Sequence, residues 1–116
     1  MVRNREIELR RDLREMRNAI DRYKDLADKN LIRSAVGSDD YPPDLDTLVK
    51  GVAFGAADRV RFLRRIPIDP MTGRAEWTLH SQQDDPDSQS WDGSNLFDVH
   101  SKSQAIALDG TAYSTW

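Results

Sequence analysis

Apolar side chains recur on one helical face through the first quarter of the chain. Their spacing alternates between four and three residues, which is the repeat of an amphipathic helix. The stripe consists of Leu9, Leu13, Met16, Ile20, Tyr23 and Ala27. No glycine or proline interrupts residues 4–29. The pattern therefore predicts one helix over this range, about 40 Å long at 1.5 Å per residue.

Charged side chains cover the other faces of this predicted helix. Four pairs of opposite charge stand four residues apart, a spacing that stabilises helices. The pairs are Glu6–Arg10, Arg11–Glu15, Arg17–Asp21 and Asp25–Lys29. Two arrangements remain open: either the whole stripe packs on the rest of the chain, or only the part from about Met16 onward packs and the first half projects. Apart from Asn4, no N-cap residue precedes the helix, so we expect the native helix to begin earlier in a longer chain.

Shorter elements follow after residue 30. Asp44 and Gly51 have the positions of an N-cap and of a C-terminal stop, and they predict a short helix between them. We expect residues 52–65 to form a loop with a helical turn. Pro67 and Pro70 restrict the backbone, which predicts an extended segment followed by a turn that begins at Pro70.

Three later segments alternate between apolar and polar side chains and predict strands. They are residues 76–80, 96–100 and 104–108. The polar residues 81–94 between the first two are too many for a tight hairpin and predict a long loop. A helix followed by short strands predicts an α+β fold, in which the long helix packs on a small antiparallel sheet of three to four strands.

The length, net charge and cysteine content of the chain exclude several classes of protein. The 116 residues predict a single domain, residues 1–116, with a helical stalk, residues 1–30, and a globular head, residues 31–116. The net charge of −3 excludes a strongly basic nucleic-acid binder, so we expect no nucleic-acid partner. The sequence has no cysteine, which excludes a disulfide framework or a thiolate site. No run approaches the roughly 20 apolar residues that span a bilayer.

The two histidines, His80 and His100, are the first candidates for catalysis. No hydrolase, P-loop or dinucleotide-binding motif accompanies them. Ser101 and Ser103 stand beside His100 in a predicted strand and cannot point toward it as a nucleophile must. We therefore interpret both histidines as solvated strand residues and expect no enzymatic activity.

Two charged clusters lie in the predicted head. The loop at 84–92 contains four aspartates, which suit calcium but lack the spacing of a calcium-binding loop. We interpret them as solvated. Four arginines at 59–65 predict a solvated face or an ion-pair partner for this loop. The clusters are Asp84, Asp85, Asp87 and Asp92, and Arg59, Arg61, Arg64 and Arg65.

Several segments taken together resemble one protein family. In order along the chain they are residues 13–24, 41–49, 62–73, 97–103 and 109–116. The most specific is the Ile66-Pro67-Ile68-Asp69-Pro70 block with Gly73 after it, downstream of Tyr41-Pro42. This order is similar to that of type II secretion pseudopilins, especially the major, G-type subunit, and more distantly to that of type IV pilins.

The resemblance implies a structural, non-enzymatic subunit. Proteins of this family carry a leader that a prepilin peptidase removes, and then about twenty apolar residues that continue into the stalk. The resemblance therefore implies a native protein that is methylated after processing and crosses the inner membrane once, with its head in the periplasm. The subunit would polymerise with itself and with minor pseudopilins, contact the secretion machinery, and drive exported proteins across the outer membrane. Residues 1–116 contain neither the leader nor the apolar segment.

The resemblance also implies candidate calcium ligands, Ser101 and Asp109. G-type subunits bind calcium near the C-terminus through a serine and later aspartates, although the Gly-rich part is shortened in this chain to residues 102–110. We expect no other cofactor. Two alternatives stay open: a type IV pilus subunit for adhesion, motility or DNA uptake, and a soluble ligand-binding or hydrolytic domain that uses the Asp-rich loop.

Overall fold

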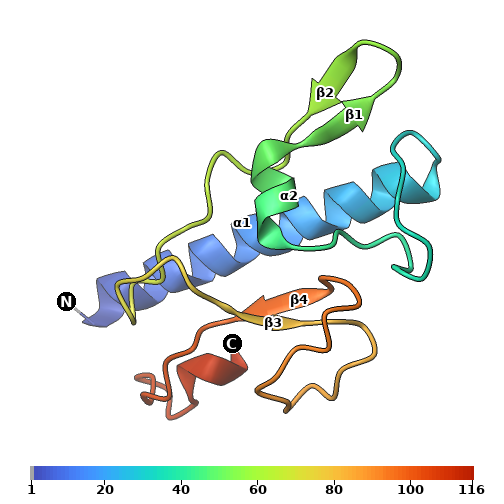
Figure 1. Cartoon of the computed structure of the whole chain (residues 1–116). Coiled ribbons are helices and arrows are strands. Elements are labelled where there is room, and N and C mark those ends of the chain that lie inside the picture. Colours follow the sequence, from blue (N-terminus) through green and yellow to red (C-terminus); the bar gives the residue numbers. More distant parts are fainter. Residues whose placement is uncertain (1) are drawn as a thin grey trace.

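The computed structural model describes residues 2–116. Met1, the first residue of the predicted stalk, lies outside the described residues. The chain forms the predicted α+β fold, in which the long helix α1, Val2–Asp28, packs against small antiparallel sheets. In Figure 1 the β1–β2 hairpin extends to one side of α1, and β3 and β4 lie on the other side.

The predicted apolar stripe of α1 is confirmed along its whole length. All six of its side chains are buried in the core. Leu9 is 0% and Leu13 is 2% exposed, so the interpretation that packs only the part from about Met16 onward is wrong. The physical reason is that the C-terminal segment of the chain covers the first half of α1, a contact that the periodicity of α1 alone does not reveal.

The predicted short helix is also present, as α2, Leu45–Lys50. The Asp44 carboxylate accepts a hydrogen bond from the Thr47 amide at 2.7 Å and caps its first turn. Gly51 ends the helix with φ at 84°, and a Cβ there would collide with the Val60 carbonyl oxygen. Two features therefore require glycine at this position: the positive φ angle and the lack of space for a side chain.

The prediction of a helical turn within residues 52–65 is wrong. The segment forms an antiparallel hairpin of β1, Val52–Phe54, and β2, Asp58–Val60. Val52, Phe54 and Val60 are half-buried against the core, which is the alternation of a strand. Gly55 has φ at 69° and allows the tight turn between the strands.

Two of the three predicted strands are present in shortened form. They are β3, Thr78–His80, and β4, Asp98–His100, which pair with Leu79 opposite Val99. The third prediction, residues 104–108, is wrong, because this segment makes only an isolated bridge between Ile106 and Ala112. A short 3-10 helix, η1, Tyr113–Thr115, follows it. The strands therefore form two separate two-stranded sheets.

The predicted turn beyond Pro70 is confirmed. The Asp69 carbonyl oxygen accepts hydrogen bonds from the amides of Thr72, at 3.3 Å, and Gly73, at 2.8 Å. The Asp69 amide in turn donates to the Arg74 carbonyl oxygen at 2.8 Å. This turn brings the Asp69 side chain into the interior beside α1.

The molecule is elongated, with principal extents of 48 × 27 × 19 Å. At 1.5 Å per residue the 27 residues of α1 account for about 40 Å of the longest extent. Within residues 2–116, no helix combines the length and the apolar character needed to cross a membrane.

Candidate functional site

The C-terminal segment, residues 101–116, docks on the first half of α1. Tyr113 Oη donates a hydrogen bond to Glu6 Oε2 at 2.6 Å, and the Leu108 amide donates to the same oxygen at 2.9 Å. The hydrogen bond to the Glu6 carboxylate raises the pKa of Tyr113 to about 12. Glu6 therefore joins the stalk to the head and is not engaged with Arg10, the partner that the spacing predicted.

Arginines of α1 complete this junction. The Arg10 guanidinium stacks over the Trp116 ring at 3.8 Å from its centroid. Arg17 Nε donates to Asp98 Oδ1 at 2.8 Å. Arg17 Nη2 donates to the carbonyl oxygens of Val99, at 2.9 Å, and of Trp116, at 2.6 Å. One arginine thus joins the stalk, β4 and the C-terminal residue.

Of the four predicted helical ion pairs, one is formed within residues 2–116, and the other three, Arg11–Glu15 among them, are not. Asp25 and Lys29 form theirs at 3.0 Å. The predicted pair of Arg17 with Asp21 is wrong, because Arg17 is committed to Asp98. The geometry favours this partner, since the Arg17–Asp98 pair is half-buried whereas Asp21 is exposed to water.

Ser101, the first candidate calcium ligand, lies in the interior. Its side chain is fully buried, and its hydroxyl donates to Asp69 Oδ2 at 2.6 Å. The Asp69 carboxylate is also fully buried and accepts a second hydrogen bond from the Met71 amide at 2.8 Å. Ser101 therefore ties the end of β4 to the turn at residues 69–74.

Asp109, the second candidate ligand, lies at the surface. Its carboxylate accepts hydrogen bonds from the Thr111 hydroxyl at 2.6 Å and from the Thr111 amide at 2.9 Å. These hydrogen bonds lower the pKa of Asp109. No hydrogen bond joins Asp109 to Ser101 in the described chain, and no group of three His, Asp or Glu side chains within residues 2–116 is arranged to hold a metal ion. Calcium binding at Ser101 and Asp109 stays a prediction.

Sequence reasoning missed a buried carboxyl group, Asp12, on the packed face of α1. It is 7% exposed and lies near Asp69. Burial raises its pKa to about 6, and the negative charges of Glu8 and Asp69 act in the same direction. The signal was available in the sequence, because Asp12 stands three residues after Leu9 and four before Met16, on the apolar stripe.

The two histidines lie together, contrary to the prediction of solvated strand residues. His80 is buried and His100 is partly buried, and their ring centroids are 5.0 Å apart across the β3–β4 pair. His100 Nε2 lies 3.4 Å from Asp98 Oδ2, and His100 Nδ1 has no hydrogen-bond partner within the described residues. Burial lowers the pKa of His100, partly offset by the Asp98 charge. Their neighbour Ser101 donates to Asp69, so its hydroxyl is not held by an imidazole base.

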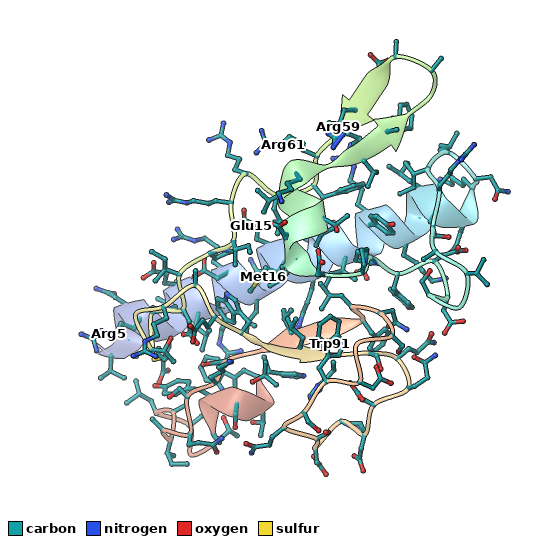
Figure 2. The ribbon with its side chains drawn as sticks, in the orientation of Figure 1. Arg5, Glu15, Met16, Arg59, Arg61 and Trp91 are labelled. Carbon is teal, nitrogen blue, oxygen red and sulfur yellow. The ribbon has the colours of Figure 1, made fainter. Side chains whose placement is uncertain are left out.

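Three of the four aspartates of the acidic loop, residues 81–94, accept hydrogen bonds that order the loop. Asp84 accepts from the Ser81 amide at 2.9 Å, and Asp85 accepts from the Asp87 amide at 3.1 Å. Asp92 accepts from the Ser94 amide and hydroxyl, which lowers its pKa. Trp91, labelled in Figure 2, fixes the last part of the loop. Its indole Nε1 donates a hydrogen bond to the Asn95 carbonyl oxygen at 2.7 Å.

The arginine patch is defined as the exposed side chains of Arg59, Arg61, Arg64 and Arg65. Arg59 and Arg61, labelled in Figure 2, lie beside α2. Arg59 Nε donates to the Lys50 carbonyl oxygen at 3.0 Å, and Arg61 Nε donates to that of Val49 at 2.7 Å. These carbonyl groups belong to the last turn of α2. No backbone amide further along the helix is present to donate a hydrogen bond to them. Arg59 and Arg61 therefore cap α2, and in residues 2–116 no ion pair joins the arginine patch to the acidic loop.

Comparisons with known proteins add no relative: no protein-family model, no curated protein and no solved structure matches this chain. The long helix on small antiparallel sheets is compatible with a pilin-like fold.

Proposed function

We propose that this chain is the stalk and head of a structural subunit of a type II secretion pseudopilus. The observation that carries the proposal is the form of α1. This helix is about 40 Å long at 1.5 Å per residue, and it accounts for most of the 48 Å extent of the molecule. The helix spans the whole head and begins one turn before its first hydrogen bond to the head, at Glu6, which suits a rod that continues beyond the head.

The first turns of α1 support this view. Leu9 is the first fully buried side chain, whereas Val2 is 50% and Ile7 is 62% exposed. The first hydrogen bonds between α1 and the head are made by Glu6, so the first turn of the helix, residues 2–5, precedes the head. An apolar extension placed before Val2 would continue the same rod into a membrane, where about twenty apolar residues are needed to span the bilayer.

The junction between stalk and head connects the rod, α1, firmly to the head. Glu6, Arg10 and Arg17 each bind the C-terminal segment or β4, so force on α1 is transmitted to the head along several contacts. In a filament the apolar extensions would bury against copies of each other, through a heterologous interface that does not close. We propose minor pseudopilins, the inner-membrane secretion machinery and exported proteins as the partners, with the head in the periplasm.

The test is to supply the proposed extension. The chain is fused behind a leader and an apolar helix, and is expressed with a secretion machinery that lacks its own major pseudopilin. We expect periplasmic filaments and restored export. Long surface filaments with twitching motility would instead indicate a type IV pilus subunit. The absence of both filaments and export, with the fusion processed and stable in the membrane, would contradict the proposal.

A matched pair of variants at Ile7 sharpens this test. Ile7 is exposed, so Ile7→Ala should leave assembly unchanged. Ile7→Pro should abolish assembly, because a proline inside a helix removes a hydrogen bond and costs about 3 kcal/mol or more. Equal export by both variants would show that continuity of the rod is not required.

A further inference from the structure

Charges of opposite sign are separated along this chain. Residues 50–65 contain five Lys and Arg residues and one acidic residue, Asp58. Residues 75–101 contain six acidic residues and no Lys or Arg. Four of these five cations form the arginine patch, and four of these six acids lie in the acidic loop. Lys50 and Asp98 lie outside both and pair elsewhere, with Asp46 and Arg17.

The arginine patch is held in place by the backbone. The Nε hydrogen bonds of Arg59 and Arg61 fix both guanidinium groups against the end of α2. Arg61 Nη2 also donates to the Arg64 carbonyl oxygen at 3.1 Å. All four side chains are exposed, and none forms an ion pair within the described residues. The guanidinium groups of Arg59 and Arg61 are therefore pre-organised, which lowers the entropic cost of binding carboxylates, and Arg64 and Arg65 add exposed positive charge.

The acidic loop is ordered in a similar way. Backbone amides of the loop donate hydrogen bonds to one carboxylate oxygen of Asp85 and one of Asp92. The side chains of Asp85 and Asp87 stay exposed. The His80 imidazole contacts the Ser88 carbonyl oxygen and connects the loop to β3. None of the loop's aspartates forms an ion pair within residues 2–116.

The two surfaces cannot meet within one molecule. The β1–β2 hairpin and its arginines lie on one side of α1, and the loop beyond β3 lies on the other (Figures 1 and 2). We propose that the arginine patch of one copy of this chain binds the acidic loop of a second copy. Because the two surfaces differ, the contact is heterologous, and each copy keeps one free patch and one free loop with which to add a further copy.

This inference names a contact between neighbouring heads, and its place in a filament rests on the proposed function. Ion pairs at exposed surfaces are individually weak and are screened by salt. In solution the contact is therefore weak, and a tether that holds copies side by side would raise its occupancy.

Disulfide trapping detects such a weak contact, and the chain has no native cysteine to interfere. Ala57→Cys places a thiol at the hairpin turn, and Gln89→Cys places one in the acidic loop; both positions are exposed. A mixture of the two single variants should form disulfide-linked dimers that contain one copy of each, at low ionic strength. The double variant should form a ladder of multimers, and molar salt should suppress both products.

Charge exchange tests which groups make the contact. Adding Arg64→Glu and Arg65→Glu to the Ala57→Cys chain should lower the yield about tenfold, since it replaces attraction by repulsion. Adding Asp85→Arg and Asp87→Arg to the Gln89→Cys chain should do the same. Mixing the two altered chains should restore the yield. As a matched control, Arg3→Glu with Arg5→Glu changes the net charge equally at the far end of α1, labelled by Arg5 in Figure 2, and should leave the yield unchanged.

Each outcome is decisive for the contact. Yields that are insensitive to the exchanged charges, or equally sensitive to the control, would overturn it. Failure here with successful export by the fused protein would refute the contact alone. Trapped multimers without export or filaments would refute the pseudopilus and leave the contact intact.

Discussion

Two buried carboxyl groups set the electrostatics of the interface between stalk and head. Asp69 is fully buried with donors from Ser101 and Met71, whereas Asp12 is buried on the apolar stripe of α1 without a hydrogen bond from the described residues. A buried carboxylate is unfavourable unless it is paired or accepts hydrogen bonds. Ionisation of Asp12 therefore lowers the stability of the folded chain.

The first prediction concerns the dependence of stability on pH. Asp12 has a pKa of about 6 in the folded chain and an ordinary value of 3.8 when unfolded. The folded state therefore binds more protons between these values, and the contribution of Asp12 to stability decreases as the pH rises from about 4 to 6. Asp12→Asn should remove this dependence and raise the free energy of unfolding at pH 7 by about 1–2 kcal/mol.

Urea unfolding of both chains at several pH values measures the effect. The difference between the chains isolates Asp12 from other carboxylates, such as Asp92 and Asp109, whose lowered pKa values act in the opposite direction. A difference that stays constant between pH 4 and 7 would contradict the assignment.

A second prediction separates the structural role of Ser101 from calcium binding. Ser101→Ala removes a donor from the buried Asp69 carboxylate and should cost about 1–3 kcal/mol of stability. Asp109→Ala, at the surface, should cost less than half as much. If Ser101 and Asp109 bind calcium, as the resemblance implies, millimolar calcium raises the Tm of the parent chain and not that of Asp109→Ala. An unchanged Tm of the parent chain would contradict calcium binding.

At the scale of elements, the sequence predicted the helices well. The stripe on α1 and the caps of α2 are local patterns, and each is present. The hairpin of β1 and β2 was missed, because Gly55-Ala56-Ala57 with short flanking strands is also compatible with a helical turn. Residues 104–108 alternate as a strand would, yet Ile106 and Leu108 are exposed and no neighbouring strand among residues 2–116 is available to them.

The junction of α1 with the C-terminal segment lay beyond sequence reasoning. Its contacts, such as Glu6 with Tyr113, join residues about a hundred positions apart. A local rule assigns Glu6 to Arg10 and Arg17 to Asp21, because it considers only neighbours on the helix. In the structure Glu6 binds Tyr113 and Arg17 binds Asp98 instead. These contacts with the head are half-buried and exclude water better than pairs on the exposed surface of the helix would.

Arg17 provides the third prediction, at the scale of this junction. Arg17→Gln removes the ion pair with Asp98 and weakens the hydrogen bonds to Val99 and Trp116, so it should lower stability by about 1–3 kcal/mol. Asp21→Asn, which changes the helical partner expected from spacing, should change stability by less than about 0.5 kcal/mol. Thermal unfolding checks both, and equal effects would contradict the role of Arg17.

At the scale of the whole molecule, the chain combines a rod with a small head of separated charge. The apolar stripe of α1 is buried from Leu9 onward, and the first hydrogen bonds of α1 to the head are at Glu6. The β1–β2 hairpin and the acidic loop extend on opposite sides of α1. Under the proposed function, a rod that continues into a membrane and heads that pair by charge would be two properties of one filament subunit. The first can be tested without reconstituting any machinery.

The most direct measurement is the N-terminal sequence of the native protein isolated from cell envelopes. The account predicts about twenty apolar residues that run without a break into the helix at Val2. It also predicts that the protein leaves the membrane fraction only with detergent. A native protein that begins within the first turn of α1 and is recovered without detergent would contradict the proposal that this helix is the stalk of a pseudopilus subunit.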